Sequence, residues 1–198
     1  MDGVTAVEAT LCSRNPHKAR ELERLLPGWR IEPLAAADWP PETGETYYEN
    51  AAAKARFGHE VGPPRRWSIG EDSGLEVEAL GGRPGVHSAR YAPEGAPAIA
   101  KLLAELEHVA DRRARYVSEL VCLLPGGGEL RGSGALAGCI AREPSGSAGF
   151  GYDPVFVPEG ERRTVAELGD EWKDRHSHRA RAARELLREA VDRLGRGA

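Results

Sequence analysis

A hairpin of two long apolar runs constrains the fold more than any other feature of this chain. The runs cover residues 116–124 and 130–140, and only five residues separate them: Pro125, three glycines and Glu129. A connection this short predicts two antiparallel strands that are neighbours in one sheet. Strand-like and helix-like segments alternate elsewhere, which favours parallel strands joined by helices. The sequence therefore predicts an α/β fold with a mixed sheet.

The remaining elements are predicted from caps and periodicity. Asn15 is a favourable N-cap and Pro16 suits the first position of a helix. Thr46 and Glu49 form a capping box ahead of an alanine-rich run. Strands are predicted over residues 7–12, 67–70 and 75–79, and helices over 16–26, 46–57, 96–109 and 177–194.

Bulk composition narrows the class of protein. The chain has 198 residues and a net charge of −4, so we expect a single domain over 1–198 with no field that attracts nucleic acid. No apolar run approaches the roughly 18 residues of a membrane span. Residues 1–6 lack the pattern of a signal peptide and are expected to be a frayed tail. These features predict a cytoplasmic protein that acts on neither nucleic acid nor membranes.

The cysteines indicate a reducing compartment. Cys12, Cys122 and Cys139 are odd in number, widely spaced, and set in runs of apolar or small residues. The sequence predicts three buried free thiols, with neither a disulfide framework nor a metal site built on CxxC.

The segment from Ser13 to Lys18 connects the first strand to the first helix. Backbone N–H groups at a helix start, together with the positive end of the helix dipole, favour an anion such as phosphate. Ser13 and Asn15 add side-chain donors, and Lys18 adds a full charge. The segment lacks the P-loop pattern. An ordinary capped helix remains the alternative.

Two adjacent carboxylates, Glu71 and Asp72, follow the predicted strand over 67–70. We place them in a loop at the strand end, before Ser73 and Gly74, where α/β proteins commonly carry their chemistry. Glu42 could supply a third carboxylate. Oxygen ligands of this kind suit Mg²⁺ when a phosphate completes the coordination. A solvated acidic loop is the alternative.

Lys54 lies one helical turn after Asn50, so the two side chains share a helix face. Alanines surround Lys54, which is an unusual setting for a solvated lysine, although a snorkelling surface lysine remains possible.

Two further clusters could bind a nucleobase. Phe150 stands between two glycines that could leave its ring face open for stacking, and Asp153 could accept hydrogen bonds from ring N–H groups. Lys173, His178 and Arg179 could donate hydrogen bonds to a keto oxygen of the base. An amino group at the same position could not accept these hydrogen bonds, so a base that carries one would be rejected. The alternatives are a buried phenylalanine beside a turn and a solvated basic helix face.

Together these segments resemble the inosine/xanthosine triphosphate pyrophosphatases, a family that acts on non-canonical purine nucleoside triphosphates. The similar blocks occur in the family's order and span nearly the whole chain. The first loop departs from the common pattern, because Arg14 and His17 replace two glycines. The blocks are residues 13–18, 42–44, 49–55, 71–75, 80–91 and 149–154, followed by Lys173 and 177–179.

The resemblance implies an elongated, two-lobed α/β domain with a long central mixed β-sheet flanked by helices, an active cleft between the lobes, and a homodimer. It implies Mg²⁺-dependent hydrolysis of ITP, dITP and XTP to the monophosphate and pyrophosphate. Asp72 corresponds to the general base and a metal ligand, Lys54 to a catalytic lysine, and Glu71 and Glu42 to further metal ligands. Substrate contacts are implied for Ser13, Arg14, Asn15, Pro16, His17, Lys18, Ser73, Phe150, Gly151, Tyr152, Asp153, Lys173, His178 and Arg179.

Two other functions remain open from sequence. A Maf-like pyrophosphatase would act on pyrimidine or modified nucleotides. A catalytically silent nucleotide-binding module would bind ITP without metal-dependent turnover.

Overall fold

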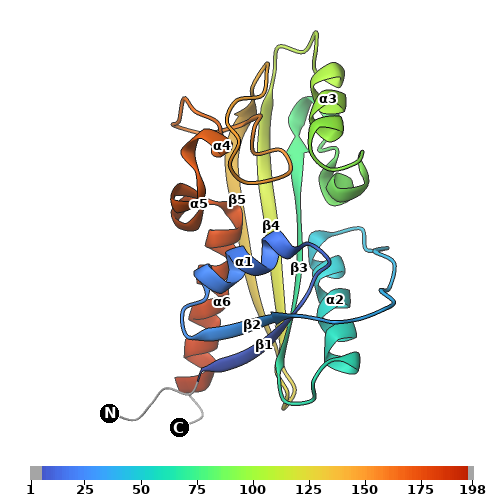
Figure 1. The fold of residues 1–198 in the computed structure, drawn as a ribbon, viewed down its shortest axis with the longest axis vertical. Coiled ribbons are helices and arrows are strands. Elements are labelled where there is room, and N and C mark those ends of the chain that lie inside the picture. The colour runs from blue at the N-terminus through green and yellow to red at the C-terminus, as the bar shows by residue number, and fades with distance from the viewer. Residues whose placement is uncertain (1–5, 196–198) are drawn as a thin grey trace. The chain divides into compact units, whose positions relative to one another are not determined.

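The computed structural model describes residues 6–195 and shows two compact units built on one mixed sheet (Figure 1). The first unit comprises Met1–Asp72, Ser118–Gly134 and Arg179–Ala198, and the second comprises Ser73–Val117 and Ala135–His178. The sheet has six strands in the order β2-β1-β3-β4-β5-β6. β1 pairs in parallel with β2 and β3, whereas β5 and β6 are antiparallel, which confirms the predicted mixed sheet. The strands are β1 (Val7–Cys12), β2 (Trp29–Pro33), β3 (Trp67–Val77), β4 (Arg113–Leu123), β5 (Glu129–Ile140) and β6 (Phe156–Pro158).

The helices agree with the local signals in the sequence. The Asn15 side chain caps the first helix, and Thr46 and Glu49 form the predicted capping box of the second. The second helix continues four residues beyond its predicted end, and the third ends four residues early, at Glu105. The α-helices are α1 (Pro16–Leu25), α2 (Tyr47–Val61), α3 (Ala96–Glu105), α4 (Val165–Leu168), α5 (Asp170–His176) and α6 (His178–Gly195), and two 3-10 helices cover Glu78–Leu80 and Gly85–Arg90.

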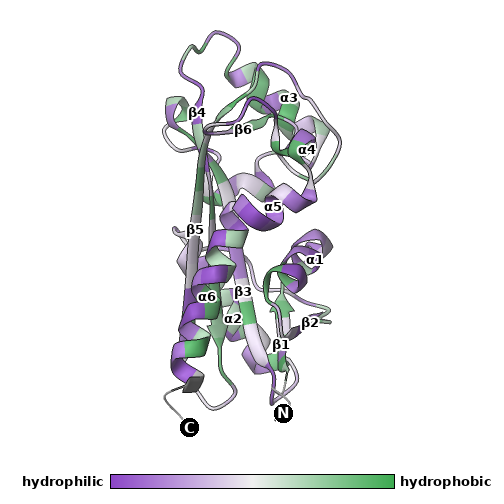
Figure 2. Cartoon of the chain, turned by 90° about the vertical axis from the view of Figure 1, so that its left-hand side faces the viewer, coloured by the Kyte–Doolittle hydropathy of each residue, from purple (hydrophilic) through white to green (hydrophobic). Residues whose placement is uncertain are grey.

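The core of the first unit joins α1 and α6 to its strands. Leu22 and Leu26 lie one helical turn apart on an apolar stripe of α1; both are fully buried, and α1 contacts β2. Leu186 of α6 is fully buried and Ala190 nearly so, whereas Val191 is 67% exposed. α6 shows both hydrophilic and hydrophobic colours along its length in Figure 2.

Two glycines let helices approach strands at backbone distance in the first unit. A Cβ added to Gly70 of β3 would lie 1.9 Å from the Ala51 carbonyl oxygen of α2. A Cβ on Gly132 of β5 would lie 2.1 Å from the carbonyl oxygen of Ala182 in α6. Real Cβ contacts are never this short, so any larger residue would push the helix away from the strand.

Two glutamates of α6 cover the edge of β5. The backbone N–H of Arg131 donates to Glu189 and that of Ser133 to Glu185, both at 2.7 Å. Glu185 and Glu189 are one helical turn apart on α6, and Arg131 and Ser133 are two residues apart on β5. The two side chains of the helix are therefore spaced to meet two successive amides on the same edge of the strand. These amides therefore find acceptors although β6 pairs only with the far end of β5, from Gly138 to Ile140.

The second unit has its own core, in which α3 covers the strand ends of that unit. Leu102 and Leu106 are fully buried there with Leu75 and Val77, and Tyr116 packs on Phe156 at 4.5 Å between ring centroids. Leu103 is only partly buried. Each unit thus buries an apolar cluster of its own, which gives each a fixed platform for polar side chains.

Two sequence-based expectations need correction. β3 runs without interruption from Trp67 to Val77, where two separate strands and a loop are predicted. Cys12 and Cys122 are buried free thiols, but Cys139 is exposed, because its position on β5 faces outward. The predicted frayed tail lies outside the described residues except for Ala6. None of the helices described between residues 6 and 195 is long and apolar enough to cross a bilayer.

Candidate active site

The predicted phosphate loop adopts a capped helix start in the first unit. The Asn15 N–H donates to Ser13 Oγ at 3.2 Å, and the His17 N–H donates to Asn15 Oδ1 at 2.9 Å. Pro16 is the first residue of α1, and the His17 ring bonds Arg20 on the outside. Two amides and two side-chain oxygens are thus engaged within the loop, so its remaining attraction for an anion comes largely from Lys18 and Arg14.

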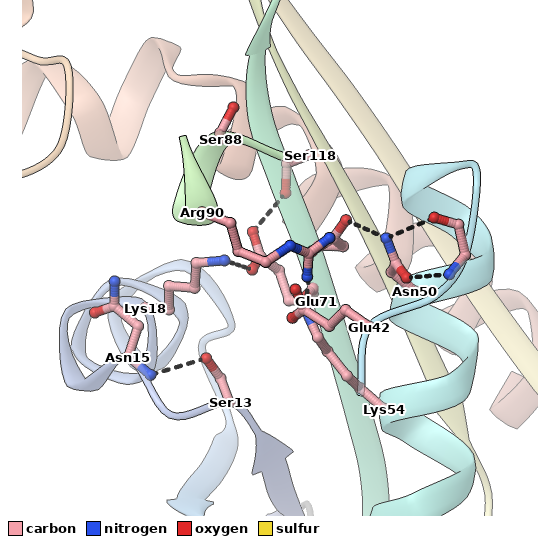
Figure 3. A network of polar contacts seen from close by, with 12 residues as sticks. Ser13, Asn15, Lys18, Glu42, Asn50, Lys54, Glu71, Ser88, Arg90 and Ser118 are labelled. Carbon is pink, nitrogen blue, oxygen red and sulfur yellow. Dashed lines mark hydrogen bonds and ion pairs between the residues drawn. The ribbon is translucent and has the colours of Figure 1, made fainter. Parts of the chain in front are cut away.

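Glu71 lies inside β3 and is completely buried, not in a loop at a strand end. Lys18 reaches it from α1, with Nζ 2.6 Å from Oε2 (Figure 3). Its Oε1 accepts from Ser118 at 3.1 Å and from Arg179 at 3.0 and 3.2 Å. Cationic and hydroxyl donors therefore compensate the loss of solvent around this carboxylate.

Arg179 is also buried, and it joins two carboxylates of the first unit. Its guanidinium bonds Glu71 and forms an ion pair with Glu21 of α1. Burial opposes ionisation of Glu71, but the charges of Lys18 and Arg179 hold its pKa well below the usual range. The pKa of Arg179 is raised, because Glu71 and Glu21 outweigh its own burial. Glu71 and Arg179 therefore both remain ionised at neutral pH.

Asp72 follows on the same strand and meets two side chains of α2. Lys54 Nζ lies 2.8 Å from Asp72 Oδ1 and 2.5 Å from Glu42 Oε1. The Asn50 amide donates to Asp72 Oδ2 at 3.3 Å and accepts from the Gly44 N–H at 2.9 Å; Figure 3 draws the hydrogen bonds of Asn50 as dashed lines. The predicted shared face of Asn50 and Lys54 is confirmed, and Lys54 is not a snorkelling surface lysine.

Burial and charge shift the pKa values of this pair. Burial raises the pKa of the Asp72 carboxyl above its ordinary value, against the opposing effect of Lys54. Burial alone would lower the pKa of Lys54, but the charges of Asp72 and Glu42 raise it. A carboxylate with a raised pKa is a better proton acceptor than a free one.

The donor set fits an oxygen-preferring cation through two carboxylates. Asp72 and Glu42 already converge on one cationic nitrogen, so their oxygens can face a shared positive charge. Glu71 faces Lys18, Arg179 and Ser118 instead. Among the described residues, no three His, Cys, Asp or Glu side chains form a ready metal cluster. Two carboxylates plus a phosphate is the ligand set that Mg²⁺ tolerates.

The predicted base-binding residues of the second unit gather around Asp153. Lys173 Nζ lies 2.9 Å from Asp153 Oδ2 and 4.6 Å from the centroid of the Phe150 ring. Asp153 also accepts from the Phe150 N–H at 3.0 Å and from the Tyr116 hydroxyl at 3.3 Å. A Cβ on Gly149 would lie 2.1 Å from this carboxylate, so glycine is required there. Asp153 and Lys173 are both almost fully buried.

The other predicted residues of this unit are His178, Tyr152, Gly151 and Ser73. His178 stacks on Tyr116 with 4.6 Å between ring centroids and 12° between planes. Tyr152 belongs to the apolar core, and burial raises the pKa of its phenol to about 12. Gly151 has a left-handed backbone at φ 62°, and Ser73 is half-buried on β3. The structure thus divides the predicted residues into one group in each unit.

Sequence reasoning missed four residues of these clusters. Glu21 occupies the apolar stripe of α1, one position before Leu22, and a charge on a buried stripe was the available signal. Ser118 and Tyr116 lie in the apolar run of β4, where nothing in sequence distinguishes them. Trp39 contacts the phosphate loop from a Pro-rich connector.

A mixed sheet that carries buried carboxylates beside lysines is typical of α/β proteins that handle phosphate compounds. The chain belongs to the Ham1 family, whose model matches residues 9–189. The resemblance found from sequence motifs is thereby confirmed.

Individual relatives are similar over nearly their whole length. The dITP/XTP pyrophosphatase of Gloeobacter violaceus is 43% identical over 179 residues, which cover 89% of this chain and 91% of that protein. The dITP/XTP pyrophosphatase of Nocardia farcinica is 44% identical, with 93% and 95% covered. Among solved structures, a HAM1 protein from Coxiella burnetii is 35% identical with a TM-score of 0.80 over 94% of this chain and 99% of that one. The Staphylococcus aureus Ham1 protein is 34% identical with a TM-score of 0.79, over 95% and 99%.

Proposed function

We propose that the protein hydrolyses the non-canonical purine nucleoside triphosphates ITP, dITP and XTP to the monophosphate and pyrophosphate, and so removes them from the nucleotide pool. The observation that carries the proposal is the convergence of Asp72 and Glu42 on Lys54, in a chain whose relatives include dITP/XTP pyrophosphatases. Two carboxylates and a lysine at one point supply both a cation site and a charge for a phosphate.

The charge balance of the first unit supports a metal requirement. The cluster contains three cationic side chains, and four carboxylates surround them, so one negative charge is in excess. A triphosphate would be repelled by such a cluster unless a cation accompanied it. The cations are Lys18, Lys54 and Arg179, and the carboxylates are Glu21, Glu42, Glu71 and Asp72.

The residues of the first unit perform the chemistry. Asp72 and Glu42 would hold Mg²⁺, which would supply charge neutralisation of the triphosphate and polarisation of the phosphorus under attack. Asp72 orients the attacking water and accepts its proton, since burial raises its pKa. Lys54 and Lys18 stabilise the charge that builds up on the leaving pyrophosphate. Asn50 fixes the orientation of Asp72 through its amide.

The residues of the second unit recognise the base. Phe150 offers a ring for stacking, and Lys173 and His178 donate to the 6-keto oxygen, a role that excludes the amino group of adenine. Arg179 contributes to the same selectivity, although its contacts with Glu21 and Glu71 also make it part of the first cluster. The selectivity test therefore uses His178→Ala, which leaves those ion pairs intact, and the ratio of kcat/KM for ITP and ATP should fall.

The deciding experiment measures pyrophosphate release from ITP, XTP, GTP, ATP and dTTP, with Mg²⁺ or with EDTA. We expect fast release from ITP and XTP that EDTA abolishes. Comparable release from dTTP would favour the Maf-like alternative. Binding of ITP without release would identify a silent nucleotide-binding module.

The remaining expectations concern the setting of the enzyme. We propose a cytoplasmic homodimer, which acts on free nucleotides and not on nucleic acid, consistent with the net charge of −4. Light scattering after size-exclusion chromatography should give twice the chain mass of 21.4 kDa. A monomeric mass would remove the dimer from the proposal.

A further inference from the structure

Arg14 is a further cation at the phosphate loop, and among the described side chains it differs from Lys18 and Lys54 in having no carboxylate partner. The Arg14 guanidinium carbon lies 5.7 Å from the centroid of the Trp39 indole ring. Lys18 is paired with Glu71, and Lys54 with Asp72 and Glu42. Among the side chains that the structure describes, no acid forms an ion pair with Arg14. Its charge is therefore not neutralised by the protein.

Trp39 is held in place on its own account. Its indole N–H donates to the Ala36 carbonyl oxygen at 3.2 Å, and its ring packs on Phe57 of α2 with 5.5 Å between centroids. A hydrogen bond at one edge and a ring at another leave the indole little freedom to rotate. The ring that attracts Arg14 is thus anchored to the same helix that carries Lys54.

The position of Arg14 suits a phosphate ligand. It lies on the loop between β1 and α1, two residues before the first residue of the helix and four before Lys18. It is exposed, so its guanidinium can reach an anion without first losing a buried partner. A guanidinium also binds phosphate oxygens with two parallel hydrogen bonds, which an ammonium cannot do.

We propose that Arg14 binds the pyrophosphate part of the substrate and that Trp39 is its positioning residue. The indole face holds the guanidinium at the loop before substrate arrives, so that less side-chain entropy is lost on binding. Because Arg14 acts on a group present in substrate and product alike, it strengthens binding of both and leaves the chemical step unchanged. This inference rests on the proposed function for the identity of the ligand.

The test measures the affinity for inorganic pyrophosphate by calorimetry in the presence of Mg²⁺, so that it does not depend on turnover. Arg14→Gln should weaken binding about tenfold, the scale of one charge-assisted contact. Trp39→Leu should weaken it about threefold, the scale of an exposed cation–π contact. Trp39→Phe keeps an aromatic face and should bind nearly as the wild type does. Arg24→Gln removes an exposed arginine of α1 away from the loop and serves as the charge control.

A double variant separates positioning from structural damage. Arg14→Gln with Trp39→Leu should bind pyrophosphate no more weakly than Arg14→Gln alone, because Trp39 acts only through Arg14. KM for ITP should rise in the same order while kcat stays constant. Equal melting temperatures for Trp39→Leu and Trp39→Phe would show that the loop remains folded.

Each outcome decides one proposal. Loss of affinity in Arg14→Gln equal to that in Arg24→Gln would overturn the role of Arg14, as would a wild type that binds no pyrophosphate. Multiplicative effects in the double variant would overturn the role of Trp39. Pyrophosphate binding that depends on Arg14, in a protein that hydrolyses no nucleotide, would refute the proposed function and leave the role of Arg14 standing.

Discussion

The polar clusters of the two units stabilise buried carboxylates in different ways. In the first unit, Glu71 is held by charged side chains from α1 and α6 and by a hydroxyl from β4. In the second, Asp153 contacts Lys173, the Phe150 backbone amide and the Tyr116 hydroxyl. The first cluster is a network of full charges, whereas the second sets the Asp153–Lys173 ion pair among aromatic rings.

We propose that the difference reflects a division of labour. A network of charges can accommodate a polyanion and its metal by exchanging partners, whereas aromatic faces and one fixed pair suit a flat, uncharged base. We therefore expect substitutions in the first cluster to affect turnover and global stability, and substitutions in the second to affect mainly substrate affinity.

The largest effect should follow from Asp72→Asn. Asparagine keeps the shape of the side chain but cannot accept the proton of the attacking water, so kcat should fall by about 10³-fold or more. Binding of ITP should be largely retained. Single-turnover kinetics and nucleotide titration measure the two quantities, and a near-normal kcat would remove Asp72 as the base.

Glu71→Gln should be the most destabilising change. It leaves Arg179 and Lys18 near a neutral amide in a completely buried position, which costs about 3–5 kcal/mol of unfolding free energy. Urea denaturation at pH 7 measures it. The matched control is Glu76→Gln in the second unit, whose partner Arg115 is 61% exposed, and which should cost less than about 1 kcal/mol. Equal costs would show that burial does not distinguish the two pairs.

Lys173→Met should raise KM for ITP about tenfold and leave kcat within a few-fold of wild type, because it removes a contact used in binding. Stability should fall by less than in Glu71→Gln, since Asp153 keeps the Phe150 amide and the Tyr116 hydroxyl as donors. Lys101→Met, an exposed lysine of the same unit, is the control. A kcat loss as large as that of Asp72→Asn would contradict the division of labour.

The smallest effect concerns the thiols, which differ between the units. Cys139 of the second unit is exposed, whereas burial raises the pKa of both Cys12 and Cys122 in the first. Iodoacetamide should add one group to the native protein and three after unfolding, as counted by mass spectrometry. Cys139→Ser should abolish the native adduct and change stability by less than about 0.5 kcal/mol.

Elements with strong local signals could be predicted from sequence, and those that depend on distant partners could not. The caps at Asn15 and Thr46 and the hairpin turn after β4 are encoded within a few residues. β2 has only five residues and ends in proline, so it shows no periodicity of its own.

The same distinction applies to the site. Glu71 and Asp72 read as a loop because acids are rare inside strands. The interior of β3 accommodates Glu71 because Lys18 and Arg179 neutralise its charge. Lys18 precedes Glu71 by 53 positions, and Arg179 follows it by 108. A single sequence contains no record of such pairings. The resemblance of motifs predicted the site residues, but only the structure shows which side chains contact them.

The two glutamates of α6 that accept the amides of β5 also determine how molecules of this protein meet one another. An uncovered strand edge is a template onto which a second chain can add a strand, the first step of many ordered aggregates. Glu185 and Glu189 occupy the acceptor positions that an incoming strand would need, and they place two negative charges beside it. A second chain that added a strand along this part of β5 would therefore have to displace both glutamates from the amides.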